Sequence, residues 1–155
     1  MVRNHAEEKR RKARMVINYK KLKGNTVFDG YYISNKTIIF NRIQWASWFS
    51  KMDCKSGYRH IKMNEESISL TAFSAPQGHY EWIAMPFGLK NAPQIFQKRM
   101  NNIFKDLTHC YLVYINDILV FSKNIEQHKD EVLATTQRCI DHGIILGKNK
   151  CIYAE

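Results

Sequence analysis

Asp53 and Asp117 are the residues of this chain whose type and position best suit chemistry. Asp117 follows Asn116 inside the stretch 111–121, YLVYINDILVF, where two apolar runs flank one polar pair. Each run is rich in β-branched, aromatic and aliphatic residues and predicts a buried strand. Asn and Asp tolerate left-handed backbone angles, so the pair predicts a tight hairpin turn that presents an amide and a carboxylate. Taken alone, the stretch also fits a core hairpin with ordinary turn residues.

Asp53 ends a second predicted strand, Trp48 to Asp53, and a turn signal follows at residues 55–58. An acidic residue at the end of a buried strand can bind a metal, but it is also common as a helix cap or turn residue. If this strand lies beside the hairpin, the carboxylates of Asp53 and Asp117 come together. Two carboxylates suit Mg²⁺, and a pair of such ions supports phosphoryl transfer.

Positive charge is concentrated at the N-terminal end of the chain. The formal net charge is +10, and residues 1–23 hold nine Lys or Arg side chains against Glu7 and Glu8. Such an asymmetry favours polyanionic partners, either nucleic acid or nucleotide phosphates, although any single lysine also fits a solvated face. Arg14 is the cation most nearly embedded in a predicted strand over residues 13–19. Its guanidinium could bind a triphosphate in a bidentate way.

Two longer segments show helical periodicity. Residues 92–104 place Pro93 in a first helical turn, and residues 125–142 predict a second helix that Gly143 ends. The inner face of the first helix is expected to comprise Ile95, Phe96, Met100, Ile103 and Phe104. The inner stripe of the second is expected to comprise Val132, Leu133, Thr136, Cys139 and Ile140.

The remaining segments predict short elements. Residues 70–74 and 80–85 flank a Pro/Gly loop and predict two strands, residues 23–25 predict a turn, and residues 147–155 predict a turn followed by a strand. Residues 37–49 are ambiguous, with a possible helix face. Together these elements predict an α+β fold, with helices on one face of a small antiparallel sheet.

The bulk composition narrows the class of protein. The chain has 155 residues and 45% hydrophobic content, which suits one domain with a real core. No apolar run is long enough to span a membrane, and the N-terminus is too polar for a signal peptide, so we expect an intracellular protein with no membrane partner. The four cysteines form no CxxC pair and no zinc-like spacing with histidine, which favours free thiols in a reducing compartment.

Four motifs, in order, resemble those of reverse transcriptases. They are RMVINYKKL at 14–22, FSKMDCKSGY at 49–58, MPFGLKNAP at 85–93 with Phe96-Gln97, and YIND at 114–117. The match is closest to plant pararetroviruses (caulimovirus family, badnavirus- and petuvirus-like, including integrated copies), and gypsy-class retrotransposons are next. The resemblance implies a palm subdomain, at about residues 48–155 with some fingers elements, and partial fingers at about residues 1–47. Thumb, ribonuclease H and protease regions are expected to be absent.

The resemblance also implies a reaction and its cofactor. A member of this family makes DNA on an RNA or DNA template-primer from deoxynucleoside triphosphates, with two Mg²⁺ ions. By that similarity Asp53, Asn116 and Asp117 take the catalytic positions, and Asp53 and Asp117 would hold metal. The carbonyl of Cys54 would touch the metal on the nucleotide side, and Arg14 would contact the triphosphate.

Four further positions follow from the same resemblance. Tyr58 would lie under the sugar and exclude a 2′-hydroxyl by bulk, while Phe87 and Gly88 would line the nucleotide and template side. For Tyr58 and Phe87, plain core packing is the alternative. Either Lys148 or Lys150 would take the place of a late basic residue of the family.

Asn116 departs from the family pattern, which has Asp at this position of the hairpin. The neutral amide offers a weaker ligand, and losing one preorganised electrostatic group typically costs on the order of 10²–10³ in rate. We therefore predict little or no polymerase activity, an expectation that the truncated length reinforces. The alternatives are an active domain cut from a longer polyprotein and a non-catalytic nucleic-acid-binding remnant.

Overall fold

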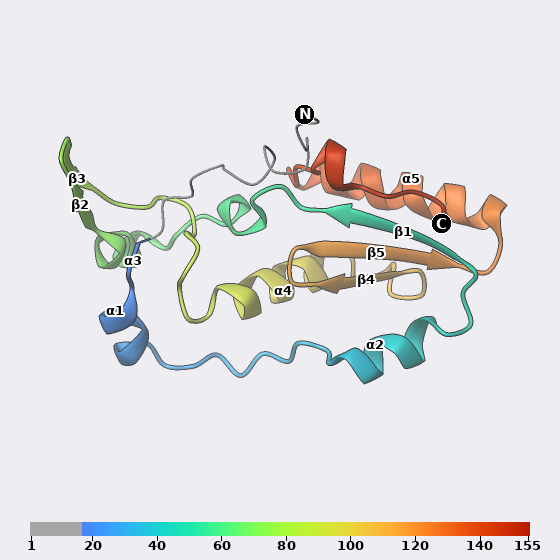
Figure 1. Ribbon diagram of the computed structural model, residues 1–155, viewed down its shortest axis with the longest axis horizontal. Coiled ribbons are helices and arrows are strands. Elements are labelled where there is room, and N and C mark those ends of the chain that lie inside the picture. Colours follow the sequence, from blue (N-terminus) through green and yellow to red (C-terminus); the bar gives the residue numbers. More distant parts are fainter. Residues whose placement is uncertain (1–16) are drawn as a thin grey trace, which may run out of the picture.

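A three-stranded antiparallel sheet forms the centre of the computed structural model, which describes residues 17–155 (Figure 1). The strands are β1 (Trp48–Asp53), β4 (Tyr111–Tyr114) and β5 (Asp117–Ser122), in the order β1-β5-β4. All three are rich in aromatic and aliphatic residues, as buried strands require. The C-terminal segment lies along the free edge of β1, where Lys51 and Ile152 exchange backbone hydrogen bonds of 2.7 and 2.8 Å.

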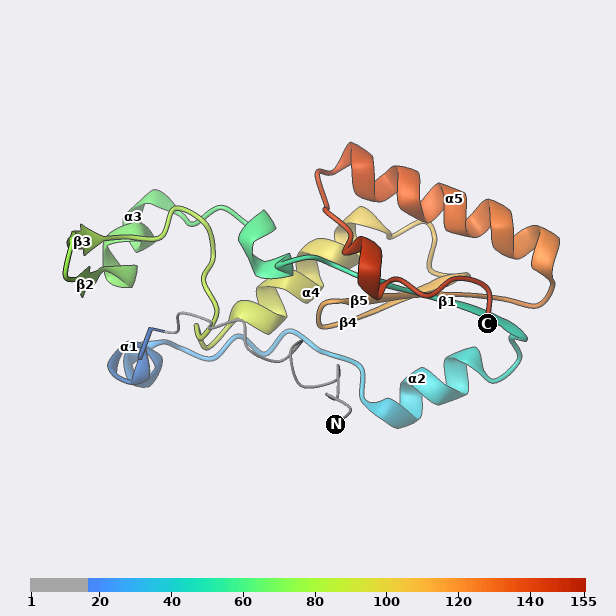
Figure 2. The same ribbon diagram turned by 45° about the horizontal axis from the view of Figure 1, so that its top comes forward.

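The alternation of side chains along the strands gives the sheet two different faces. On one face Met52, Ile118 and Val120 are fully buried beneath α4 (Ala92–Ile103) and α5 (Ile125–Asp141). The other face carries Asp53 and Asp117. Figure 2 shows α5 on one side of the sheet and α2 (Lys36–Ile43) on the other. The predicted α+β class is confirmed, with α4 and α5 on one face as expected.

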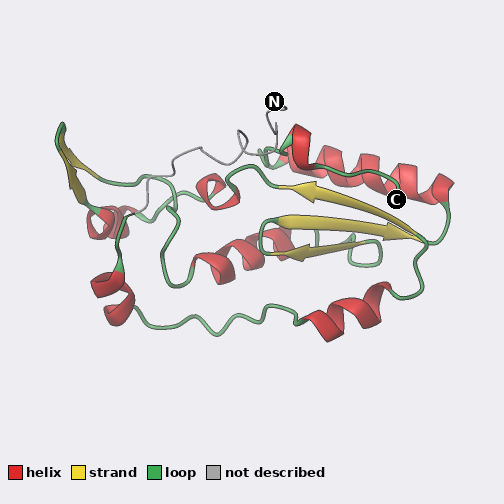
Figure 3. Ribbon diagram, viewed as in Figure 1, coloured by secondary structure: helices red, strands yellow, loops and turns green. Residues whose placement is uncertain are grey.

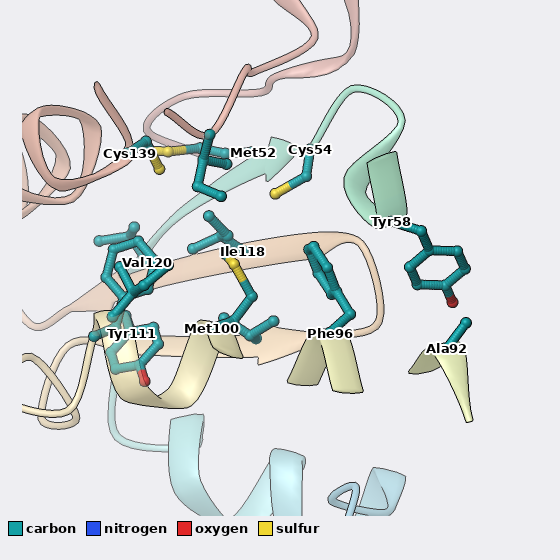
Figure 4. Packing of buried hydrophobic residues seen from close by; sticks show 14 of the residues in the cluster. Met52, Cys54, Tyr58, Ala92, Phe96, Met100, Tyr111, Ile118, Val120 and Cys139 are labelled. Carbon is teal, nitrogen blue, oxygen red and sulfur yellow. The ribbon is translucent and has the colours of Figure 1, made fainter. Parts of the chain in front are cut away.

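The core lies between the sheet and its two long helices (Figure 4). Phe96 and Met100 of α4 are fully buried against the strands, and Pro93 occupies the first turn of that helix, as predicted. Cys139 brings α5 into the same cluster. Tyr58 packs at the edge of the cluster, with its ring centroid 5.7 Å from that of Phe96.

The inner face of α5 differs from the prediction. Leu133 and Ile140, both expected inside, are 67% and 64% exposed. Cys139 is fully buried, as predicted, and Val132 packs partly buried against the core. The other fully buried positions of this helix are His128 and Thr135, and Glu131 is nearly so. The sheet end beneath the helix presents the hydroxyls of Ser50 and Ser122, which form hydrogen bonds with His128 and Glu131. The end of α5 is as predicted, because Gly143 adopts the left-handed φ of +66° that suits a helix terminus.

The N-terminal part of the described chain is helical or irregular, so the prediction of a strand there is wrong for residues 17–19. Helix α1 (Lys20–Asn25) takes the place of the predicted turn at residues 23–25. Residues 13–16 of the predicted strand lie outside the described part of the chain. The ambiguous segment after residue 36 does form a helix, α2.

The Pro/Gly loop forms a small hairpin that stands apart from the main sheet (Figure 3). Its strands are β2 (Phe73–Ala75) and β3 (Gly78–Tyr80). They overlap the predicted strands only at residues 73–74 and at residue 80. The prediction for residues 80–85 is wrong beyond Tyr80, where one isolated bridge joins Lys62 and Ala84. Short helical segments were not predicted at α3 (Glu65–Ile68), or as 3₁₀ turns at η2 (Gly57–His60), η3 (Ser69–Thr71) and η4 (Lys148–Lys150).

Within residues 17–155, none of the helices is both long and apolar enough to cross a lipid bilayer.

Candidate active site

Asp53 and Asp117 face each other at one end of the paired strands β1 and β5. Asp53 is the last residue of β1, Asp117 is the first of β5, and their Cα atoms are direct partners in the antiparallel ladder. Facing partners in a ladder project from the same side, so both carboxylates lie on the face opposite α4 and α5. The side chain of Asp53 is 20% exposed and that of Asp117 is 40% exposed. The structure thus brings together the two acids that the sequence singled out.

Two lysines neutralise this acidic pair. The ammonium of Lys51 lies 3.1 Å from Oδ2 of Asp117, and that of Lys150 lies 3.4 Å from Oδ1 of Asp53. Like charges opposite each other in a sheet repel, and the two ion pairs offset that repulsion. Of the two late lysines proposed from the sequence, Lys150 is the one beside Asp53. Lys51 was missed, although its place two residues before Asp53 on the same strand puts it on the same face.

Gly147 forms a second support for Asp53 that sequence reasoning missed. Its N–H donates a 2.8 Å hydrogen bond to the backbone carbonyl of Asp53. A Cβ atom at residue 147 would lie 3.0 Å from Oδ2 of Asp53, closer than side chains normally approach. The absence of a side chain at Gly147 therefore leaves room for the carboxylate. Only the three-dimensional pairing of residues 147 and 53 reveals this contact.

The turn that positions Asp117 is shifted by one residue from its predicted place. Tyr114 and Asp117 are ladder partners, so the two turn residues are Ile115 and Asn116, and Asp117 already belongs to β5. The left-handed backbone angle falls on Ile115, with φ +58°, an unfavourable conformation for a β-branched residue. The carbonyl of Asn116 accepts a 2.8 Å hydrogen bond from the N–H of Cys54. This bond ties the hairpin tip to the residue that follows Asp53.

The side chain of Asn116 does not offer its oxygen to the acidic face. Its Oδ1 atom is buried and has no hydrogen-bond partner within residues 17–155. It lies against Gly57, where a Cβ atom would come within 2.8 Å of it.

Tyr58, Phe87 and Phe96 form an aromatic cluster. Tyr58 is 8% exposed, and its ring centroid lies 5.3 Å from that of Phe87, which is 46% exposed. Burial raises the pKa of the Tyr58 hydroxyl, so it stays protonated near neutral pH. Gly88 adopts φ +96°, and a Cβ there would lie 3.7 Å from the ring of Tyr19. The structure thus brings Tyr58 and Phe87 together, with Tyr58 packed in the core.

The side chain of Cys54 belongs to the core. The side chain is 2% exposed, and burial, with a smaller contribution from Cys139, raises the pKa of the thiol to about 12. The thiol therefore stays protonated near neutral pH. All four cysteines are free thiols, as predicted. Arg14, the predicted triphosphate contact, lies outside the described residues.

Of the three residues expected at a magnesium site, Asp53 and Asp117 offer suitable ligands and Asn116 does not. Asp53 and Asp117 present partly exposed carboxylates on one face, and carboxylate oxygen is the ligand that Mg²⁺ prefers. Asn116 contributes no charge, and its oxygen is buried. The donor set of the described residues therefore carries one negative charge fewer than the reverse-transcriptase resemblance implies.

Several viral polyproteins share sequence with this chain over almost its whole length. It is 48% identical over 150 residues to the enzymatic polyprotein of Cauliflower mosaic virus (strain Strasbourg), covering 97% of this chain and 22% of the polyprotein. It is 48% identical over 151 residues to the enzymatic polyprotein of Soybean chlorotic mottle virus, covering 96% and 22%. It is 45% identical to the putative enzymatic polyprotein of Cassava vein mosaic virus, covering 97% and 23%. The chain thus spans about a fifth of these relatives.

Solved structures share the fold at lower sequence identity. The foamy viral protease-reverse transcriptase in complex with an RNA/DNA hybrid matches with a TM-score of 0.83 and 20% identity, over 90% of this chain and 19% of that one. A form of that protein in complex with double-stranded DNA matches with a TM-score of 0.84 and 20% identity, over 92% and 25%. The family model described as reverse transcriptase (RNA-dependent DNA polymerase) matches residues 4–155. The chain therefore belongs to the reverse transcriptase family.

Proposed function

We propose that this chain carries the catalytic centre of an RNA-directed DNA polymerase, and that this centre works weakly. The observation that carries the proposal is the pairing of Asp53 with Asp117 on one open face of the sheet. Membership of the reverse transcriptase family and the similarity to viral enzymatic polyproteins support it. The substrates would be a template-primer of RNA or DNA and deoxynucleoside triphosphates.

The residues around the acidic pair would divide the work of binding and orientation. Asp53 and Asp117 would hold Mg²⁺, which when bound supplies positive charge to the reacting phosphate. Tyr58 would support the sugar of the incoming nucleotide, and its bulk would exclude a 2′-hydroxyl. Phe87 would line the nucleotide and template side, because its ring packs on Tyr58 while remaining 46% exposed.

Two backbone positions and the side chain of Arg14 complete the proposed nucleotide site. The carbonyl of Cys54, the residue after Asp53, would face the ion on the nucleotide side. Gly88 would let the chain approach the nucleotide closely, because its φ of +96° is strained for any residue with a side chain. Arg14 would bind the triphosphate through its guanidinium. We further propose that residues 1–47 supply part of the fingers and residues 48–155 mainly the palm.

The weakness of the centre would follow from its charge. Where the family has three carboxylates, this chain has two, because residue 116 is Asn. Lys51 and Lys150 place an ammonium beside each of those two carboxylates. A divalent ion must displace or outweigh these cations, so both its affinity and its stabilisation of the transition state should fall. Loss of one such group typically costs on the order of 10²–10³ in rate.

The test is single-nucleotide incorporation on a primed template with Mg²⁺, by the wild type, Asn116→Asp and Asp53→Asn. We expect weak incorporation by the wild type, a rise of about 10²-fold or more in Asn116→Asp, and none in Asp53→Asn. Incorporation by Asp53→Asn at the wild-type rate would refute the assignment of the centre. Wild-type incorporation equal to that of Asn116→Asp would refute its weakness.

A second candidate function is nucleic-acid binding without catalysis. The buried oxygen of Asn116 and the net charge of +10 favour it. In that case the chain would bind a primed template with an affinity that falls steeply as salt rises, because phosphate contacts release counterions. Binding of that kind, together with no incorporation even in Asn116→Asp, would favour this candidate over the polymerase.

A further inference from the structure

His109, Cys110 and Glu131 bring three metal-binding atoms together, far from the acidic pair. One atom of each residue lies within 4.8 Å of the other two, and no other such group of three or more occurs within residues 17–155. His109 and Cys110 lie in the connection that leads from α4 into β4, and Glu131 lies on α5. Neighbouring His and Cys residues have no zinc-like spacing in the sequence, so only the fold reveals this cluster.

The cluster lies at the opposite end of β5 from the proposed magnesium site. Asp117 begins that strand and Ser122 ends it, and the Ser122 hydroxyl donates a hydrogen bond to Oε2 of Glu131. Five residues of strand separate the two ends by roughly 16 Å. The cluster also lies on the helix-covered face, whereas Asp53 and Asp117 lie on the other. It is therefore independent of the proposed polymerase centre.

Hydrogen bonds hold the carboxylate of Glu131 in place, as they do for carboxylates that bind metals. Its side chain is only 10% exposed, and a buried carboxylate needs compensating partners. Besides the Ser122 hydroxyl, the side-chain amide of Gln127 donates a 2.7 Å hydrogen bond to Oε1. Hydrogen bonds of this kind orient ligating carboxylates in metal sites. The exposed imidazole of His109 lies 3.9 Å from Oε1 of Glu131.

Cys110 and His109 supply one fixed and one adaptable ligand. The backbone of Cys110 is fixed, because its carbonyl accepts a 2.8 Å hydrogen bond from the N–H of Phe121. Its side chain is buried, with a weak 3.4 Å contact from Sγ to the carbonyl of Leu107. The side chain of His109 is 63% exposed and free to turn. Bond lengths of about 2.0–2.3 Å place the ligand atoms of tetrahedral zinc about 3.3–3.8 Å apart, so the three atoms need to approach one another by about 1 Å to close the site.

We propose that His109, Cys110 and Glu131 bind Zn²⁺ through Nε2, Sγ and Oε1, with water at the fourth position. Thiolate and imidazole select zinc rather than magnesium, and one thiolate and one carboxylate neutralise the ion. As the Sγ–Zn bond forms, the thiol proton passes to solvent, a change that the charge of the ion favours. The ion ties the connection before β4 to α5 and leaves the acidic face untouched. An ordinary ion pair between His109 and Glu131 is the competing explanation.

Cobalt(II) is the probe, because it replaces zinc and gives a thiolate charge-transfer absorption. The full chain is titrated with Co²⁺ in excess Mg²⁺, which fills carboxylate sites. We expect the band to saturate at one equivalent and excess Zn²⁺ to abolish it. Cys110→Ser should remove the band, and His109→Ala should weaken the affinity about tenfold or more. The matched controls Cys151→Ser and His142→Ala should leave the band and the affinity unchanged.

Three results would overturn the proposal. They are a wild-type chain without the band, a band that survives in Cys110→Ser, and an unchanged affinity in His109→Ala. The last variant removes an exposed side chain, so it should fold even if Cys110→Ser does not. Circular dichroism of each variant checks the fold before titration.

Discussion

At the scale of single residues, the charge around the acidic pair decides what this chain can do. Asp53 and Asp117 are matched by Lys51 and Lys150, so the described site is nearly neutral before any ion arrives. A site with Asp in place of Asn116 would keep one net negative charge. That difference is the physical basis of the proposed weakness, because ligand charge is a main determinant of divalent-ion affinity.

The ion pair of Lys51 gives the first prediction. Lys51→Gln removes the ammonium 3.1 Å from Asp117 and should raise the affinity for Mn²⁺, a spectroscopic substitute for Mg²⁺. Both partners are about half exposed, so we expect only about a two- to fivefold gain. Electron paramagnetic resonance of free Mn²⁺ measures it. Lys129→Gln, which removes a lysine paired with Glu126 on α5, is the control and should change nothing. An unchanged or weaker affinity in Lys51→Gln would contradict the account.

At the scale of elements, close backbone packing holds the hairpin tip against η2. Gly57 lies beneath Asn116 and the ring of Phe96, and a Cβ there would come within 2.8 and 3.0 Å of them. Gly57→Ala should therefore lower the free energy of unfolding by about 1–3 kcal/mol, as overpacking does. Urea unfolding measures the change.

Gly24→Ala is the control for this contact. Gly24 lies in α1 with nothing within 4 Å of its missing Cβ. Alanine there should stabilise the helix by about 0.5–1 kcal/mol, because it removes backbone freedom from the unfolded chain. If both variants shifted the unfolding midpoint in the same direction, close packing at Gly57 would not be the cause.

The faces of α5 give the third prediction. Leu133 is 67% exposed, so Leu133→Gln should change the free energy of unfolding by no more than about 0.5 kcal/mol. Thr135 is fully buried, and Thr135→Gln should cost about 1–3 kcal/mol. Thermal unfolding compares the two. The apolar stripe expected from the sequence predicts the reverse order, so a larger loss in Leu133→Gln would contradict the structure.

At the scale of the whole molecule, the reactivity of the cysteine thiols indicates how the domain unfolds. Cys139 is fully buried between α5 and the core, and burial, with a smaller contribution from Cys151, raises the pKa of its thiol to about 12. Its thiolate, the reactive form, is therefore scarce in the folded protein. Cys151 is partly exposed.

We predict that iodoacetamide labels Cys151 first and Cys139 only when the domain unfolds globally. Peptide mass spectrometry at mildly alkaline pH measures both rates, and raising the pH increases the thiolate fraction and hence the labelling of exposed thiols. In concentrated urea the two rates should converge. Equal rates in native buffer would show that α5 opens locally.

Much of the fold follows from local patterns in the chain. Strand β1 has the predicted bounds, and α4 and α5 lie within one residue of theirs, because apolar periodicity and a few special residues define them. The paired acids could be anticipated for the same reason, since each ends or begins a strongly apolar strand. The ordered motifs then indicated the family.

Features that depend on tertiary contacts could not be predicted. The polar inner face of α5 exists because His128 bonds to Ser50 and Ser122 at 2.7 and 2.9 Å, partners that are distant in the sequence or on another element. The turn falls on Ile115 because the ladder register, rather than turn preference, sets it. The approach of Gly147 to Asp53 likewise appears only after folding.

The most direct test of the central claim is the affinity of the acidic pair for Mn²⁺ in Asn116→Asp against the wild type, with Asp53→Asn as the control. Restoring the third carboxylate should tighten binding by at least about tenfold, because the ion gains a charged ligand. Asp53→Asn should bind more weakly than the wild type. Equal affinities in Asn116→Asp and the wild type would contradict the claim that residue 116 limits this site.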